Sequence, residues 1–89
     1  MNIHTPRPED ILPDGIDSTE LNGKVVRKGT IAAFLANAEI LENAQADEKT
    51  KQVALTTLKE LAPNVIAIGL HKQVIFKNPV VEQILVDAE

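Results

Sequence analysis

The sequence predicts an α+β fold in one compact domain, residues 18–89, preceded by a flexible arm over residues 1–17. Apolar residues recur at helical spacing in three segments, whereas two short segments are rich in β-branched residues. The 26 Ile, Leu and Val residues and the ten Ala residues are enough for one modest core. Because the chain has no Cys, its stability must come from packing or from association with another chain.

The arm over residues 1–17 lacks the periodic apolar face that would hold a helix or strand in place. Residues 1–20 hold one basic and five acidic side chains, and Asp14-Gly15 is a turn signal. Its prolines are Pro6, Pro8 and Pro13, and its apolar anchors are Ile11, Leu12 and Ile16. We expect these anchors to hold the arm only loosely across a groove. The acidic arm is otherwise a solvated tail, and binding to a basic groove on a partner protein is the alternative.

A tight hairpin is expected at Asn22-Gly23, since this dipeptide between β-capable arms strongly favours a two-residue turn. An alternative is a helical turn that begins at Asp17 and uses Glu20 as its capping partner. The segment from about 24 to 28 then forms a strand. Residues 73–77 are β-branched and aromatic, and we expect them to pair with 24–28 in a small antiparallel sheet.

The first helix is predicted over about 31–43, with the Thr30 hydroxyl as its N-terminal cap after Gly29. One apolar face comprises Ile31, Phe34, Leu35, Ala38 and Leu41. A second apolar stripe on the other side comprises Ala32, Ala33, Ala36 and Ile40. A helix that is apolar on both sides is normally covered on both sides, and in so short a chain another copy is as good a candidate for the second cover as another helix.

A second helix is predicted over about 48–61, capped by Asp47 and followed by Pro63, which should interrupt it. The short link before it favours an antiparallel helix pair. Residues 64–70 fit either a short helix or a buried strand, and we favour the helix. Asn78 and Pro79 mark the start of a last helix that runs to about residue 87.

The composition also narrows the classes of function. The net charge of −4 argues against a duplex-binding surface, and the segment before residue 20 lacks the pattern of a secretory signal. We expect no membrane span, because the longest stretches without a charged side chain are far shorter than the ~20 residues that a spanning helix needs. With one Ser, no Cys and two His, we expect no enzyme activity, no catalytic residue, no cofactor and a cytoplasmic location.

Three further sites can be weighed from the sequence. Arg27, Lys28 and Thr30 surround a predicted helix start, which we interpret as a helix cap beside two solvated charges. A site for a small anion or metabolite is the alternative, although the order Lys-Gly-Thr differs from that of a phosphate-binding loop. A calcium loop starting at Asp10 fails, because its third and twelfth positions are leucines. His71 should lie in a surface turn near the sheet edge, without the further ligands that a metal needs.

The leading functional interpretation is a non-enzymatic domain that acts through protein contacts, as a homodimer or higher oligomer. The interface is expected at Ala32, Ala33, Ala36 and Ile40. One alternative is an anion-binding or metabolite-binding module at Arg27–Thr30. The other is a DNA-binding regulator of the helix-turn-helix type, which is disfavoured because the first helix has no cation and the second has lysines without arginine.

Overall fold

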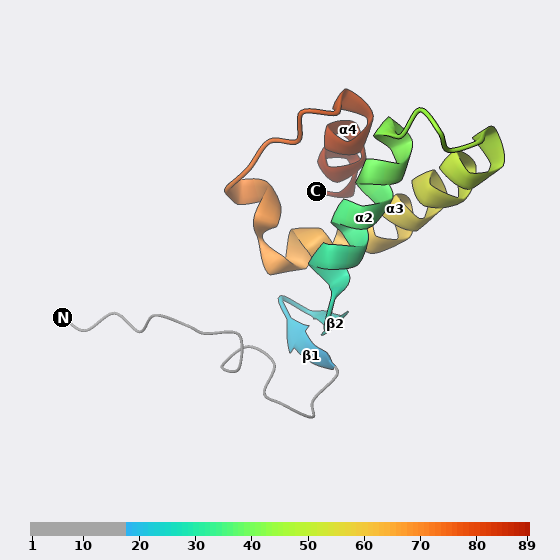
Figure 1. The fold of residues 1–89 in the computed structure, drawn as a ribbon. Helices are drawn as coiled ribbons and strands as arrows, with labels where there is room; N and C mark the ends of the chain where they lie inside the picture. The colour runs from blue at the N-terminus through green and yellow to red at the C-terminus, as the bar shows by residue number, and fades with distance from the viewer. Residues whose placement is uncertain (1–17) are drawn as a thin grey trace.

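The computed structural model describes residues 18–89 and shows, within them, an α+β fold of three α-helices and a two-stranded antiparallel sheet (Figure 1). The elements in order are β1 (Ser18–Leu21), β2 (Lys24–Arg27), α2 (Thr30–Glu42), α3 (Glu48–Ile68), the 3-10 turn η1 (Leu70–Lys72) and α4 (Pro79–Ala88). The expected arm, with Ile11, Leu12 and Ile16, lies outside the described residues. Within residues 18–89, no helix combines the length and the apolar character that a membrane span requires.

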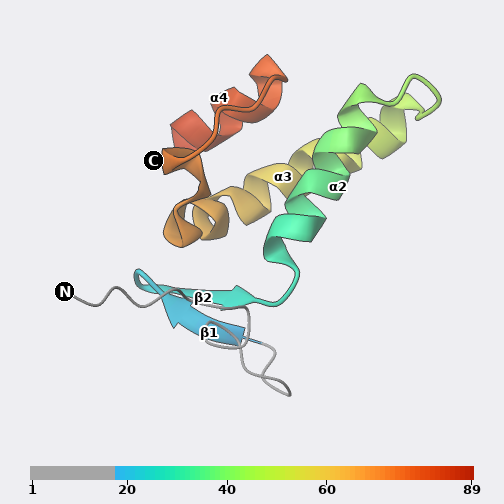
Figure 2. The same ribbon diagram turned by 60° about the vertical axis from the view of Figure 1, so that its left-hand side comes forward.

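The predicted hairpin is confirmed, and the helical alternative for this segment is wrong. β1 pairs with β2 in the register Ser18↔Arg27 to Leu21↔Lys24, so Asn22 and Gly23 form the two-residue loop. Both loop residues have positive φ, 48° and 82°, as a type I′ turn requires. Val26 is the buried residue of the sheet, and the hairpin lies across one end of the helices (Figure 2).

The expected pairing of 24–28 with 73–77 is wrong, because residues 73–77 form a connecting segment without a strand. β2 takes its neighbour β1 as partner instead, since closing a two-residue loop costs far less chain entropy than joining segments so distant in sequence. The segment turns only Phe76 inward. The Phe76 ring meets the Phe34 ring edge to face, with the ring centres 5.5 Å apart.

The helix starts follow local capping signals, with one exception. The Asp47 side chain accepts a hydrogen bond from Thr50 N–H, and the Asn78 side chain accepts from Val80 and Val81 N–H, with Pro79 in the first turn. Thr30 does not cap α2 as expected. It is the first helical residue, and its hydroxyl donates to the Arg27 carbonyl at 2.7 Å, so α2 begins after Gly29 without a side-chain cap.

The expected end of the second helix near residue 61 is also wrong, because α3 continues through Pro63 to Ile68. An internal proline costs about 3 kcal/mol or more. Beyond it, however, Val65 and Ala67 are buried, and this burial offsets the cost. Residues 64–68 are therefore helical, as favoured, although within α3 and not in a separate helix. Gly69 ends α3 in the left-handed conformation, with φ of 94°.

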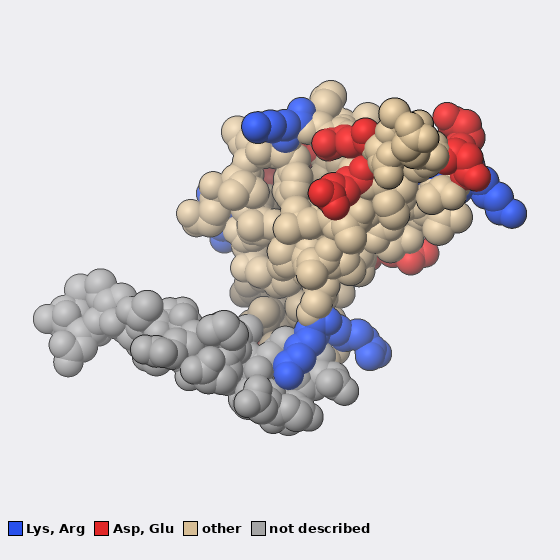
Figure 3. Space-filling view, in the orientation of Figure 1, with Lys and Arg blue, Asp and Glu red and all other residues tan. Residues whose placement is uncertain are grey.

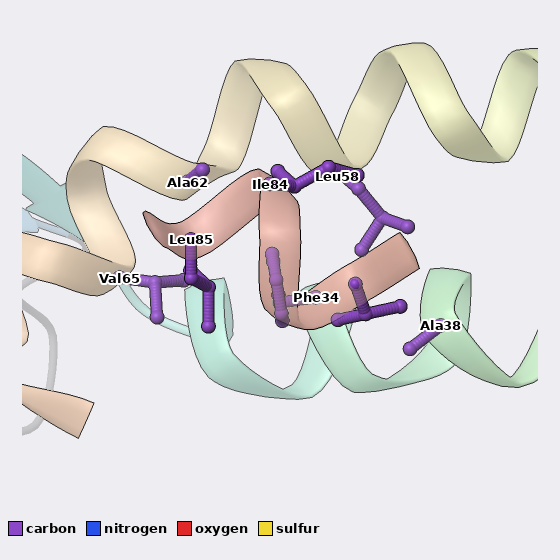
Figure 4. Packing of buried hydrophobic residues seen from close by; sticks show 8 residues of the cluster. Phe34, Ala38, Leu58, Ala62, Val65, Ile84 and Leu85 are labelled. Atoms are coloured by element: carbon purple, nitrogen blue, oxygen red, sulfur yellow. The ribbon is translucent and has the colours of Figure 1, made fainter. Parts of the chain in front are cut away.

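The core lies between the three helices. Phe34 and Ala38 project from α2, Leu58, Ala62 and Val65 from α3, and Val81, Ile84 and Leu85 from α4 (Figure 4). α2 and α3 lie side by side along much of their length, joined by a short link, as the helix pair was predicted to do (Figure 2). One side of α2 is thereby covered, and its other side faces away from this core.

Candidate protein-interaction surface

The outer side of α2 forms one wall of a shallow apolar groove, which we call the α2 groove, with a volume of about 810 Å³. The exposed residues of its α2 wall are Ala32, Leu35, Ala36, Glu39 and Glu42, and Ile31 and the core residue Ala38 also border it. Its opposite wall comprises Leu70, Val74, Ile75, Phe76, Lys77 and Asn78. Among the described residues that line it, the charged ones are Glu39, Glu42 and Lys77, so most of this described surface is apolar.

The most exposed large apolar side chain in this groove is Ile75, which is 82% exposed. Its side chain is exposed because the neighbouring residues on both sides are held in place by contacts with the rest of the fold. The Phe76 ring packs on Phe34, and Phe76 N–H donates to the Glu82 carboxylate at 2.9 Å. Val74 N–H donates to the Leu70 carbonyl at 3.2 Å. These contacts of Val74 and Phe76 fix the backbone on both sides of Ile75, so the Ile75 side chain is left exposed to solvent.

The predicted second stripe of α2 divides in two. Ala32 and Ala36 are exposed and line the α2 groove, whereas Ala33 is exposed and Ile40 half-buried without lining it. Leu35, predicted to face inward, is 46% exposed and belongs to the groove instead. The remaining predicted inward residues are buried or partly buried. Within residues 18–89, then, the chain does not fully cover its own first helix.

Charges along α2 are separated by a long apolar stretch. Arg27 and Lys28 immediately precede the helix, Glu39 and Glu42 lie in its last turns, and no charged residue intervenes. Figure 3 shows the result, with basic side chains where the hairpin meets α2, acidic side chains at the far end and an uncharged area between them. Both ends oppose the helix dipole, which favours acidic groups at the start and basic groups at the end. Within residues 18–89, neither charged end of α2 is favoured by the dipole of its own helix.

The three residues predicted to bind an anion are brought together by the structure. Arg27, Lys28 and Thr30 line a second hollow of about 490 Å³, which we call the hairpin pocket. Its other described lining residues are Thr19, Leu21, Val26, Gly29, Ile31, Ala32 and Ile68. The Thr30 hydroxyl already donates its proton to the Arg27 carbonyl, and Thr30 is only 6% exposed. Anion binding stays a prediction that rests on the two basic side chains.

His71 lies in the turn η1, in a depression that it shares with the hairpin residues Asn22 and Lys24. Its Nε2 is 4.0 Å from a carboxylate oxygen of Glu89, and its Nδ1 is buried and finds no hydrogen-bond partner among residues 18–89. Among residues 18–89, no three His, Asp or Glu side chains are grouped as metal ligands would be. In the described part of the chain, the acidic neighbour of His71 is thus Glu89.

The helix-turn-helix alternative also stays a prediction. Its lysines, Lys49, Lys51 and Lys59, all belong to α3, and Lys51 is half-buried. α2 and α3 lie side by side, whereas the two helices of a helix-turn-helix cross at about 90–120°. The arrangement lends this alternative no support.

No protein-family model matches this sequence, and the searches of curated proteins and of solved structures likewise gave no match. The chemistry of the described surface is therefore the basis for assigning a function.

Proposed function

We propose that this chain is a small cytoplasmic domain that acts through protein contacts and not by catalysis, and that it forms a homodimer through the α2 groove. The outer side of α2 in each copy packs antiparallel against the same side of α2 in the other. A two-fold axis near Leu35 relates the two copies, because Leu35 lies midway between Lys28 and Glu42 in the sequence.

The charge pattern of α2 is the observation that carries this proposal. In an antiparallel pair, Arg27 and Lys28 of each copy lie beside Glu39 and Glu42 of the other, so both charged ends find opposite charges. Antiparallel packing also brings together opposite ends of the two helix dipoles. The groups that are unfavourably placed on a single α2 become complementary in the pair.

The groove supplies the apolar contact between those charged ends. Ala32 and Ala36 are small and exposed, which lets the two helix backbones approach closely. A stable dimer buries about 800 Å² per copy, more than one short helix provides. Leu35 and the exposed Val74 and Ile75 widen the contact on each side of the alanines. Scarcity of reactive groups and absence of Cys support the non-catalytic and cytoplasmic parts of the proposal.

Light scattering at micromolar concentration tests the proposal, with Ala36→Arg as the disruptive variant. We expect the wild-type chain to have the mass of two copies and Ala36→Arg that of one, because an arginine at the axis forces apart two closely packed helices. Ala33→Arg is the matched control, since Ala33 is exposed on the same helix but does not line the groove.

Thermal unfolding of both variants separates association from folding. Substitutions at exposed positions change stability by about 0.5 kcal/mol or less, so the monomeric form of Ala36→Arg should unfold much as that of Ala33→Arg does. A wild-type monomer at micromolar concentration would refute the dimer. So would an unaltered dimer in Ala36→Arg.

Anion binding at the hairpin pocket is a second candidate, favoured by the position of Arg27 and Lys28 on one lining. A thermal-shift screen with phosphate, nucleotides and carboxylates tests it. A ligand at 100 times its dissociation constant adds about 2.7 kcal/mol to the free energy of unfolding. A screen without any shift removes this candidate.

A further inference from the structure

The hairpin pocket adjoins the point where the N-terminal arm joins the described chain. Thr19, the second residue of β1, lines the pocket, and Ser18 is the first residue of β1. The lining is apolar except for the Thr19 and Thr30 hydroxyls and the Arg27 and Lys28 side chains. An occupant that fits this surface combines aliphatic side chains with negative charge.

We infer that the pocket is the docking site of the chain's own N-terminal arm, residues 1–17, with Ile11 and Leu12 on its apolar lining. The arm has the required chemistry, because these two aliphatic residues are flanked by Asp10 and Asp14. It is acidic where the rim of the pocket is basic.

The pairing of the hairpin brings the start of the arm close to the basic residues. Ser18, which follows the arm, is paired with Arg27, the last residue of β2, and Lys28 follows directly. The acidic arm therefore joins the described chain beside two basic residues, which favours its attraction to them. The Asp14-Gly15 turn signal then allows the chain to reverse and lead Leu12 back over the lining.

Chain length permits this path. Leu12 precedes Ser18 by six residues, which span at most about 20 Å when extended. A ligand on so short a tether has an effective concentration on the order of millimolar, so modest apolar burial is enough to keep the site occupied. Docking covers Ile31 and Ile68, two half-buried residues at the joint between the hairpin and the helices.

Paramagnetic relaxation tests the inference on the full chain. Because the chain has no Cys, Thr5→Cys gives a single site for a nitroxide label on the arm. We expect broadening of the Ile31 and Ile68 amide signals, which lie far from the arm in sequence. Leu12→Ser should lower the docked-to-free ratio roughly tenfold and restore these signals, because it removes one buried leucine side chain.

Ile3→Ser is the matched control, since it changes an aliphatic residue of the arm that the inference leaves outside the pocket. It should leave the broadening unchanged. Equal broadening in the Leu12→Ser and Ile3→Ser chains would overturn the inference, because the effect would then come from the tether alone. The absence of broadening at Ile31 and Ile68 would overturn it as well.

A mixed sample identifies which copy supplies the arm. Isotope-labelled chains without the nitroxide are mixed with spin-labelled chains of natural isotope abundance. Docking within one chain predicts no broadening in this mixture. Broadening in this mixture would overturn the inference in favour of arm exchange between copies. The outcome does not depend on the α2 dimer, because Ala36→Arg can be introduced into every sample.

Discussion

α2 and α4 are both short helices on the same core, yet they are built differently. α4 begins with a side-chain cap from Asn78, a proline in its first turn and the acidic Glu82, and it buries one face, at Val81, Ile84 and Leu85. α2 begins without a side-chain cap or an acidic first turn and ends with Glu39 and Glu42. α2 carries apolar residues on two sides, and only one of these sides is buried.

This difference distinguishes the residues that stabilise the fold of one copy from those that do not. The cap, the proline and Glu82 of α4 stabilise the helix in a single copy, although its last turn carries the acidic Asp87, as the last turn of α2 carries Glu42. α2 keeps its place through Phe34 and Ala38, while its terminal charges and outer alanines contribute nothing to that packing. Because the terminal charges and outer alanines of α2 do not contribute to the packing of one copy, we interpret them as contacts with a second copy.

The strongest test of this separation compares Phe34 with its neighbour Leu35. Phe34 is 0% exposed and Leu35 is 46% exposed. We expect Phe34→Ala to lower the free energy of unfolding by about 3–5 kcal/mol, since it opens a cavity between the helices and removes the contact with Phe76. Leu35→Ala should lower it by about 0.5 kcal/mol or less, while weakening association. Denaturant unfolding measures both.

If Phe34→Ala fails to fold, Phe34→Leu provides a milder cavity for the same comparison. Equal destabilisation by Leu35→Ala and the Phe34 variant would show that both sides of α2 belong to the core of one copy.

Reversing the acidic end of α2 should have opposite effects on folding and association. In the double variant Glu39→Lys and Glu42→Lys, basic groups at the helix end interact favourably with the dipole, which raises the stability of the monomer by about 0.3–1 kcal/mol. Dimerisation should weaken by about 1–2 kcal/mol, a factor of about 5–30, because like charges then meet Arg27 and Lys28 of the second copy.

Adding Arg27→Glu and Lys28→Glu to that variant should restore the dimer, as measured by sedimentation or light scattering. A weakened dimer that the second pair of substitutions fails to rescue would contradict antiparallel pairing.

The caps of α4 predict a smaller and purely local effect. The Asn78 side chain accepts from Val80 N–H at 2.9 Å and from Val81 N–H at 3.4 Å. Asn78→Ala should cost about 1 kcal/mol in the free energy of unfolding and leave the dimer mass unchanged. Gln52→Ala, at an exposed position of α3, serves as the control and should be neutral. Loss of the dimer in Asn78→Ala would mean that α4 takes part in association.

The cap of α3 gives the smallest effect, one that depends on pH. The hydrogen bond from Thr50 N–H to the carboxylate, 2.7 Å long, and the bond with the Thr50 side chain hold the pKa of Asp47 below its ordinary value of 3.8. A lowered pKa stabilises the fold above 3.8, and this contribution is lost as the pH falls through the folded-state pKa. Asp47→Asn keeps a capping oxygen at every pH, so its stability should fall less steeply below pH 4 than that of the wild-type chain.

The unfolding curves of the two proteins, subtracted at each pH, isolate Asp47 from the other acidic residues. A difference that stays constant from pH 5 to pH 2 would show that the Thr50 hydrogen bonds do not favour the charged carboxylate.

Local signals in the sequence predicted the elements that depend on local chemistry. Asn22-Gly23 specified the hairpin, and Asp47 and Asn78 specified two helix starts, because a backbone turn or a side-chain cap needs only near neighbours. The prediction that Pro63 ends the second helix was wrong for the opposite reason. Its local cost is real, but it is outweighed by burial of residues beyond it, and burial depends on the whole fold.

The surface was predictable only in part. The double-sided apolar pattern identified Ala32 and Ala36, but helical periodicity placed Leu35 on the wrong side, since it does not say which neighbours will cover a helix. Residues 73–77 have the composition of a strand, and nothing local shows that Glu82 will bind the Phe76 amide and leave Ile75 outside. Arg27, Lys28 and Thr30 were found together because they are adjacent in sequence.

Asn22 links the turn of the hairpin to its place on the helices. It tolerates the positive φ of 48° that the turn requires, and its side-chain amide donates to the Ala67 carbonyl, at the end of α3, at 2.7 Å. A glycine at position 22 would accommodate the positive φ, and a glutamine could donate to the Ala67 carbonyl, but neither residue would do both. Asn22 thus determines both the turn conformation of the hairpin and the contact of the hairpin with α3. A substitution at this one position therefore affects both features.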